Sequence, residues 1–239
     1  ALIRGSTKDN SSKVFIFSLA ILTCIASFNF GYHTAIVSAA LGPIQTTFHF
    51  EDPVTGPINS EESSFATTGN PASGLLKGIV VSAGLVSALA GALVTGSIAD
   101  RIGRAYTVMI DEALFLLGAL ICALSYWYWM LVVGRLVVGL AVGFSSVAVP
   151  LLLGEISPPS VRGQMGVINQ LAITLGILAA YAIGTGFLYT PVWLGWRLMF
   201  AFTIVLSILH MIVSMIFVRV ESPRWLVKVN RLDACLLYT

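Results

Sequence analysis

The residues that could do chemistry in this chain are few, and they lie inside or beside long apolar segments. Arg135 stands near the start of one such segment, Glu155 and Arg162 lie in the turn after it, and Gln170 lies in the next segment. Charges in membrane segments are costly and mark function, whereas an amide donates and accepts hydrogen bonds without carrying charge. A charged turn between two spans, followed by an uncharged hydrogen-bonding group, indicates transport of a neutral polar solute.

The chain offers no set of residues suited to covalent chemistry. No nucleophile–base pair and no set of metal ligands stands out. Cys24, Cys122 and Cys235 are odd in number and widely spaced, so we interpret them as packing residues. We therefore expect no catalytic residue, no metal and no cofactor. The net charge of +2 likewise indicates no nucleic-acid partner.

The elements that must position these residues are membrane-spanning helices. The 239 residues are 57% hydrophobic and only 10% charged, whereas roughly a quarter of the residues of a soluble domain are charged. A helix needs about 20 apolar residues to cross a bilayer, and lipid leaves no partner for unpaired backbone groups. The sequence predicts six spans: Val14–Ile36, Ile79–Ala99, Ala105–Trp127, Met130–Leu153, Met165–Leu188 and Arg197–Val218.

The distribution of Lys and Arg predicts the orientation, with the N-terminus in the cytoplasm. Only Lys77, Arg135 and Arg197, of thirteen basic residues, then lie toward the outside. The same orientation gathers six aromatic residues at the outer interface as a belt: Trp127, Tyr128, Trp129, Tyr189, Trp193 and Trp196.

The predicted layout has three parts. Residues 1–13 form a cytoplasmic segment, and residues 14–218 form the bundle of six spans. Residues 219–239 begin a cytoplasmic linker. Within the bundle, residues 42–74 are rich in Pro, Ser and Thr and are expected to form a long external loop. Because the chain starts at Ala1 and stops abruptly at Thr239, we expect it to be a fragment of a longer protein.

Small residues recur inside the spans. Gly139 and Gly143 lie four apart, as do Gly74 and Gly78, and this spacing lets helices approach closely. The six spans also divide into two triplets with weakly similar first helices. This pattern is typical of inverted three-helix repeats in transporters.

Five short motifs follow one another along the chain, and in that order they resemble the sugar-porter branch of the major facilitator superfamily. Val220 departs from the family pattern, since it replaces the first proline of the last motif. The motifs are GSIADRIGR (96–104), GRLVVG (134–139), GEISPPSVRG (154–163), NQLAITLGI (169–177) and ESPRWL (221–226).

The resemblance implies a fold and a function. The fold is an all-α integral membrane protein, equivalent to the six-helix N-terminal half of a twelve-helix major facilitator transporter. The function is transport of a monosaccharide such as a hexose across the plasma membrane by alternating access. The implied partners are the sugar, the lipid bilayer and a missing C-terminal half, or a second copy of this chain.

The resemblance also implies residues that contact the solute. Gln170 is the foremost candidate, because its amide suits sugar hydroxyls. Ile173 and Ile177 lie on the same face of the helix and would form an apolar wall. Phe30, in the FGY motif of the first span, would line the cavity. The alternatives are an interhelical hydrogen bond for Gln170 and core packing for Phe30, whereas Asn169 is expected to be structural.

Charged residues gather at the predicted cytoplasmic ends of the spans. In the resembled family such a cluster holds the outward-facing state and breaks when the protein opens inward. The alternative is ordinary positive-inside topology with local helix caps. The predicted gating residues are Asp100, Arg101, Arg104, Glu155, Arg162, Glu221 and Arg224.

His33 departs from the family pattern. Proton-coupled sugar porters carry Asp at this position, and Arg135 matches the arginine that pairs with that acid. His33 could couple transport to protons or act as a neutral hydrogen-bonding residue, and Arg135 could pack or pair elsewhere, so coupling stays open. For Asp111 and Glu112 we expect one to reach the cytoplasmic headgroups and the other to pair with a basic neighbour.

Two other functions remain open from the sequence. The protein could carry another neutral solute, such as a polyol or inositol. It could also be a truncated membrane protein that does not transport and instead acts as a sensor or partner. An enzyme is the class that the residues support least.

Overall fold

The computed structural model describes residues 2–48, 71–217 and 225, with side chains described for residues 23–48, 74–187, 189–214 and 225. This part of the chain is helical, and six of its helices are long and apolar enough to cross a membrane. They are α1 (Leu2–Thr47), α2 (Pro71–Ile102), α3 (Arg104–Ala123), α4 (Tyr128–Ile156), α5 (Arg162–Gly186) and α6 (Val192–Phe217), with a short 3₁₀ turn, η1 (Phe187–Tyr189), before α6.

Several helix ends differ from the predicted spans. α1 continues beyond Ile36 to Thr47 and includes Pro43, while α2 begins at Pro71. The predicted loop of residues 42–74 was therefore too long at both ends. α1 also begins at Leu2, so residues 2–13 of the predicted cytoplasmic segment are helical. α6 begins five residues before Arg197. These errors arise because hydropathy locates the apolar part of a helix but not the polar turns that extend it.

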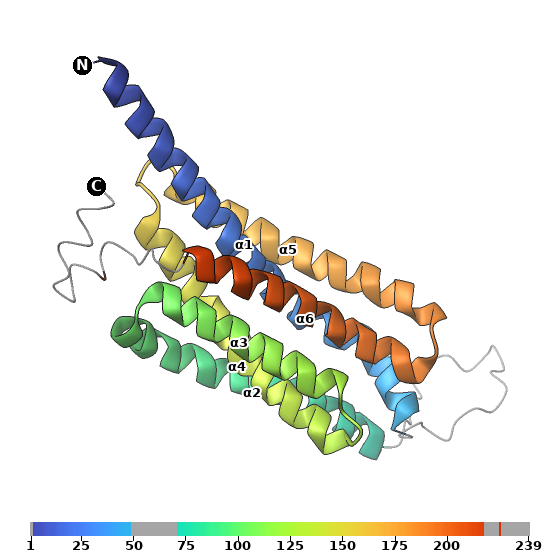
Figure 1. Cartoon of the computed structure of the whole chain (residues 1–239). Coiled ribbons are helices and arrows are strands. Elements are labelled where there is room, and N and C mark those ends of the chain that lie inside the picture. Colours follow the sequence, from blue (N-terminus) through green and yellow to red (C-terminus); the bar gives the residue numbers. More distant parts are fainter. Residues whose placement is uncertain (1, 49–70, 218–224, 226–239) are drawn as a thin grey trace, which may run out of the picture.

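The helices lie side by side as a bundle, and the N-terminal end of α1 extends beyond it (Figure 1). α2 packs along α4, and α1 packs along α5. α3 packs against α4 and α6, and α1 also contacts α6 and α4. α1 and α2 touch at few points. The bundle therefore has α1 and α4 at its centre, where they form two cavities with their neighbours.

Glycine allows the closest of these helix contacts. A Cβ atom at Gly143 of α4 would lie 2.2 Å from the carbonyl oxygen of Ala88 in α2. A Cβ atom at Gly139 would lie 1.9 Å from the hydroxyl of Ser87. The predicted close approach at these two glycines is confirmed. It is not seen at Gly74 and Gly78, where a Cβ would meet nothing within 4 Å among the described residues.

The main hydrophobic core joins α1, α3, α4 and α6 around the side chains of Tyr32, Phe115, Trp196 and Phe200, among others. Trp196 is fully buried, and its indole nitrogen donates a hydrogen bond to Thr47 Oγ1 at 3.1 Å. The assignment of Trp196 to an interfacial belt was therefore wrong, because it lies on the inner face of α6. Trp127, Trp129, Tyr189 and Trp193 are exposed, as an interfacial position requires.

We expect Gly143→Ala to destabilise the protein by about 1–3 kcal/mol, because the added methyl group meets the α2 backbone and forces the two helices apart. Gly78→Ala is the matched control. Its Cβ has open space, so the change should be neutral or slightly stabilising. Thermal unfolding of the two purified variants in detergent measures the difference. Equal unfolding temperatures would show that the α2–α4 contact does not limit stability.

Candidate solute cavity and charge cluster

A cavity of about 270 Å³ lies between α1, α4 and α5. Phe30 of α1 and Gln170 and Ile173 of α5, three of the four residues expected to contact the solute, line it. The other lining residues are Ser27, Ser145, Ser146, Pro150 and Asn169. The cavity thus combines apolar surface with hydroxyl and amide groups, which is the composition of a small-molecule site.

Gln170 has the most open position of these residues. Its side chain is exposed, and its amide makes no hydrogen bond to any described residue. An amide that is not used to join helices is free to bond a solute. The alternative reading of Gln170 as an interhelical link therefore finds no support in the described residues. Ile177 lies about two turns after Gln170 along α5 and packs against the main core, outside the cavity lining.

Asn169, and not Gln170, forms the hydrogen bond between α1 and α5. Its Oδ1 accepts a hydrogen bond from the hydroxyl of Ser27 on α1. Two glycines bring the helices close enough for this bond. A Cβ at Gly31 would lie 2.0 Å from the carbonyl oxygen of Ile173, and one at Gly176 would lie 2.2 Å from that of Phe28. This close contact between α1 and α5 fixes the position of Gln170 in the cavity.

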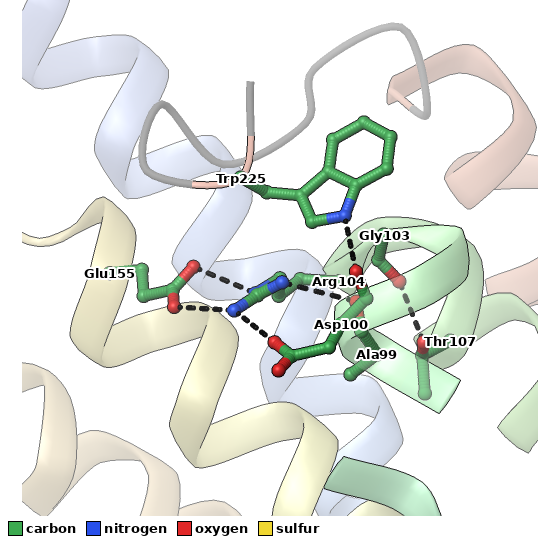
Figure 2. Close-up of polar contacts among 7 residues, drawn as sticks. All are labelled: Ala99, Asp100, Gly103, Arg104, Thr107, Glu155 and Trp225. Atoms are coloured by element: carbon green, nitrogen blue, oxygen red, sulfur yellow. Dashed lines mark hydrogen bonds and ion pairs between the residues drawn. The ribbon is translucent and has the colours of Figure 1, made fainter. Parts of the chain in front are cut away.

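Arg104 is the centre of the charge cluster (Figure 2). Its Nε lies 3.0 Å from Glu155 Oε2 and its Nη2 lies 2.9 Å from Asp100 Oδ1. Its Nη1 also donates to the carbonyl oxygen of Ala99 at 3.1 Å. Trp225 donates from its indole nitrogen to the carbonyl oxygen of Asp100 at 3.2 Å. The guanidinium therefore joins the ends of α2, α3 and α4 in one network.

The turn between α2 and α3 positions this arginine. Gly103 has a φ of 114°, which side chains other than glycine rarely adopt, and its carbonyl oxygen accepts the hydroxyl of Thr107 at 2.6 Å. This one-residue break lets α3 start immediately after α2. Arg104 therefore begins α3 and lies within reach of Asp100, one turn earlier in the chain.

The other predicted gating residues do not join this network in the described part of the chain. Arg101 is exposed and forms no ion pair with a described residue. Arg162 donates to the carbonyl oxygen of Ser157 at 3.4 Å. Glu155, its nearest acid in the sequence motif, pairs with Arg104 and not with Arg162. Glu221 and Arg224 lie outside the described residues.

His33 and Arg135 are both buried, and both face a second, smaller cavity. The His33 ring stacks on Phe115, with ring centroids 4.9 Å apart and an angle of 8° between the planes. The Arg135 guanidinium lies over Phe200, 6.0 Å from the ring centroid. A cation–π contact contributes roughly 0.5–2 kcal/mol, whereas leaving a buried charge without its partner costs about 3–5 kcal/mol. The ring alone therefore does not compensate for burying this charge.

A third polar group, which the sequence did not reveal, joins α1, α3 and α6. His210 Nδ1 lies 2.9 Å from Glu112 Oε1, and both side chains are fully buried. Asn29 Nδ2 donates to Glu112 Oε2 at 3.0 Å. Asp111 is also fully buried, so the expectation that one of the two acids reaches the headgroups was wrong, whereas the expectation that the other pairs with a basic neighbour is confirmed for Glu112. A titratable residue inside a predicted span, such as Glu112 or His210, indicates a buried polar contact. The sequence does not show that these two residues contact each other, because they lie in different spans.

The profile of the family described as "Sugar (and other) transporter" matches residues 19–235. The chain belongs to this family. Among curated members, the glucose transporter GlcP of Staphylococcus epidermidis is 38% identical over 218 residues, which are 91% of this chain and 42% of the relative. The myo-inositol transporter 2 of Cryptococcus neoformans is 34% identical over 239 residues, or 98% of this chain and 39% of the relative. The chain thus spans less than half the length of these sugar-transporter relatives.

Solved structures give the same architecture. The proton:xylose symporter XylE, a major facilitator protein, superposes with a TM-score of 0.80 at 24% identity, covering 95% of this chain and 49% of that chain. An inward-open conformation of XylE from E. coli superposes with a TM-score of 0.74. The predicted fold, six helices equivalent to about half of a major facilitator sugar porter, is confirmed.

The contacts of Arg104 predict two unequal couplings. A double-mutant cycle between Arg104→Ala and Glu155→Ala should give a coupling free energy of about 1–3 kcal/mol, because both side chains are nearly buried. The cycle between Arg104→Ala and Asp100→Ala should give less than about 1 kcal/mol, because the Asp100 side chain is 48% exposed. Unfolding of the variants in detergent measures both, and a larger coupling to Asp100 would contradict the geometry.

Proposed function

We propose that this chain is the N-terminal half of a transporter that moves a monosaccharide across a membrane by alternating access. The observation that carries the proposal is the amide of Gln170, which has no hydrogen-bond partner among the described residues and lines the cavity between α1, α4 and α5. Hydroxyl groups of a sugar both donate and accept hydrogen bonds, so they match an amide and the nearby serine hydroxyls. Family membership supports the same substrate class.

The missing partner of this half is a second six-helix bundle, or a second copy of the chain. α2 and α5 are the helices that the bundle covers least, and their outer faces are rich in leucine. Exposed examples are Leu85, Leu89 and Leu93 on α2, and Leu171, Leu175 and Leu178 on α5. These faces would be covered by the other half or by lipid. The cavity around Gln170 would then be closed by residues of both halves.

The Arg104 network is the gate in this proposal. It holds three helix ends together through one guanidinium, and two carboxylates share its charge. Opening of the transporter at the end of the bundle where this network lies would separate Glu155 from Arg104. A network of this kind is stable when the groups are desolvated together and weakens when water enters. Arg101 and Arg162 would take part only if they move relative to the arrangement seen here, whereas Glu221 and Arg224 lie outside the described residues.

An inositol or another polyol is the second candidate solute. Myo-inositol transporters are among the relatives with the widest coverage of this chain. The same cavity residues would serve, because a cyclic polyol presents hydroxyl groups like those of a hexose. A membrane protein that binds a sugar without transporting it, as a sensor or partner, is a further outcome that the uptake experiment below distinguishes.

We expect labelled hexose uptake in cells that lack hexose transport when the chain is completed by a second half, for example that of GlcP. Gln170→Ala in the completed protein should raise the KM by about 5- to 150-fold, because a buried hydrogen bond left unmade costs about 1–3 kcal/mol. Gln164→Ala is the matched control, since this amide lies on the same helix but outside the cavity.

Several outcomes of this experiment would redirect the proposal. Uptake by the chain alone would mean that six helices, or two copies of them, suffice. Competition by myo-inositol but not by glucose would identify the second candidate as the solute. Binding without uptake would favour the sensor or partner role. Equal KM values for the two glutamine variants would remove Gln170 from the site.

We also propose that the protein lies in the plasma membrane with its N-terminus in the cytoplasm. In a variant without Cys24, Cys122 and Cys235, a cysteine at Tyr126 should react with an impermeant maleimide on intact cells. A cysteine at Ile102, at the opposite end of the bundle, should react only after permeabilisation. Both positions are exposed. The reverse labelling pattern would invert the proposed topology.

A further inference from the structure

The smaller cavity lies between α1, α2 and α4 and has a volume of about 100 Å³. It is lined by His33, Thr34 and Ser38 of α1, by Gly84 and Leu85 of α2, and by Arg135 of α4, among others. Thr34, Ser38 and Leu85 are exposed, so the cavity can be reached from the surface of the bundle. A volume of this size holds a few water molecules or one small ion with its water.

Two buried polar side chains face this cavity without partners. His33 is fully buried, and neither ring nitrogen makes a hydrogen bond to a described residue. Arg135 is 6% exposed, and its Nε and Nη1 also lack hydrogen-bond partners among the described residues. No acid of the described part of the chain forms an ion pair with Arg135, since the acids with such pairs bond Arg104 or His210.

The close approach of α2 makes this arrangement possible. A Cβ at Gly84 would lie 3.2 Å from Arg135 Nη2, so the guanidinium lies directly against the backbone of α2. The Arg135 side chain therefore lies between the backbone of α2 and the Phe200 ring, whose centroid is 6.0 Å from Cζ. Any side chain at position 84 would compete with the guanidinium for the same space.

The chemistry of this lining selects one class of ligand. A buried guanidinium needs acceptors and a compensating negative charge, and the lining contains no carboxylate. Water and neutral solutes supply acceptors but no charge, and a cation would be repelled. We propose that the cavity binds a small monovalent anion such as chloride, with Arg135 as its counter-charge and His33 and Ser38 as hydrogen-bond donors. This site is separate from Gln170 and does not depend on sugar transport.

The first test is the thermal unfolding of the purified chain in detergent, with chloride titrated against methanesulfonate at constant ionic strength. A ligand that binds only the folded protein stabilises it by mass action. At a chloride concentration ten times the Kd, the unfolding temperature should have risen by about 3–6 °C, and it should go on rising with the logarithm of the chloride concentration. No chloride dependence, or one that methanesulfonate reproduces, would overturn the proposal.

Variants locate the effect. Arg135→Gln removes the counter-charge, and the shift with chloride should disappear. His33→Asp places a carboxylate at the cavity, so it should replace the bound anion and make the unfolding temperature independent of chloride. Arg197→Gln is the matched control, because Arg197 already donates to the carbonyl oxygens of Trp193 and Ser125, and it should keep the full shift.

Further measurements keep the proposal testable if Arg135→Gln does not fold. His33→Gln retains a neutral donor and should weaken chloride binding several-fold without abolishing it. A chloride shift that persists unchanged in folded His33→Asp would place the ion elsewhere and overturn the assignment. Glucuronate and glucose differ by one carboxylate, so comparing them in methanesulfonate buffer shows whether the anion at Arg135 is instead a carboxylate of the transported solute. Stabilisation by glucuronate but not by chloride would contradict an inorganic anion.

Discussion

Close backbone contact between helices is the constraint on which the rest of this structure depends. α1 meets α5 at Gly31 and Gly176, and α2 meets α4 at Gly139 and Gly143. At each glycine a side chain would collide with the neighbouring backbone or side chain. Lipid gives helices little hydrophobic reason to associate, so packing at small residues must hold them together. These contacts fix α1 and α4 at the centre, and both cavities are bounded by that pair.

Polar groups inside the bundle divide into those that join helices and those that do not. Glu112 contacts both His210 and Asn29, so this group joins three helices, and all three side chains are fully buried. Gln170 and Arg135 face cavities instead, without hydrogen-bond partners at the amide of Gln170 or at Nε and Nη1 of Arg135 among the described residues. A polar group in a membrane span is expensive unless it is paired. The unpaired groups are therefore where binding is expected, and the paired ones explain how the helices stay in register.

Arg104 and Arg135 show how surroundings give one side chain two roles. Arg104 contacts two carboxylates and a backbone carbonyl, so its charge is compensated within the chain and links three helix ends. Arg135 has an aromatic ring and a glycine backbone beside it, and its charge has no partner in the described residues. The first arrangement suits a contact that forms and breaks between conformations. The second suits a site that takes its counter-charge from solution.

The sequence by itself determined the membrane class, the six apolar helices and the family, because hydropathy and short ordered motifs are local properties. Through the resemblance it also grouped Phe30, Gln170, Ile173 and Ile177 as solute contacts, and of these Ile177 lies outside the cavity lining. Only the tertiary structure decided which groups meet across helices: that Glu155 pairs with Arg104 and that Glu112 pairs with His210. It also decided that Trp196 faces the core. Spacing along a helix defines which residues share a face, but the rotation and distance of the neighbouring helix decide what that face meets.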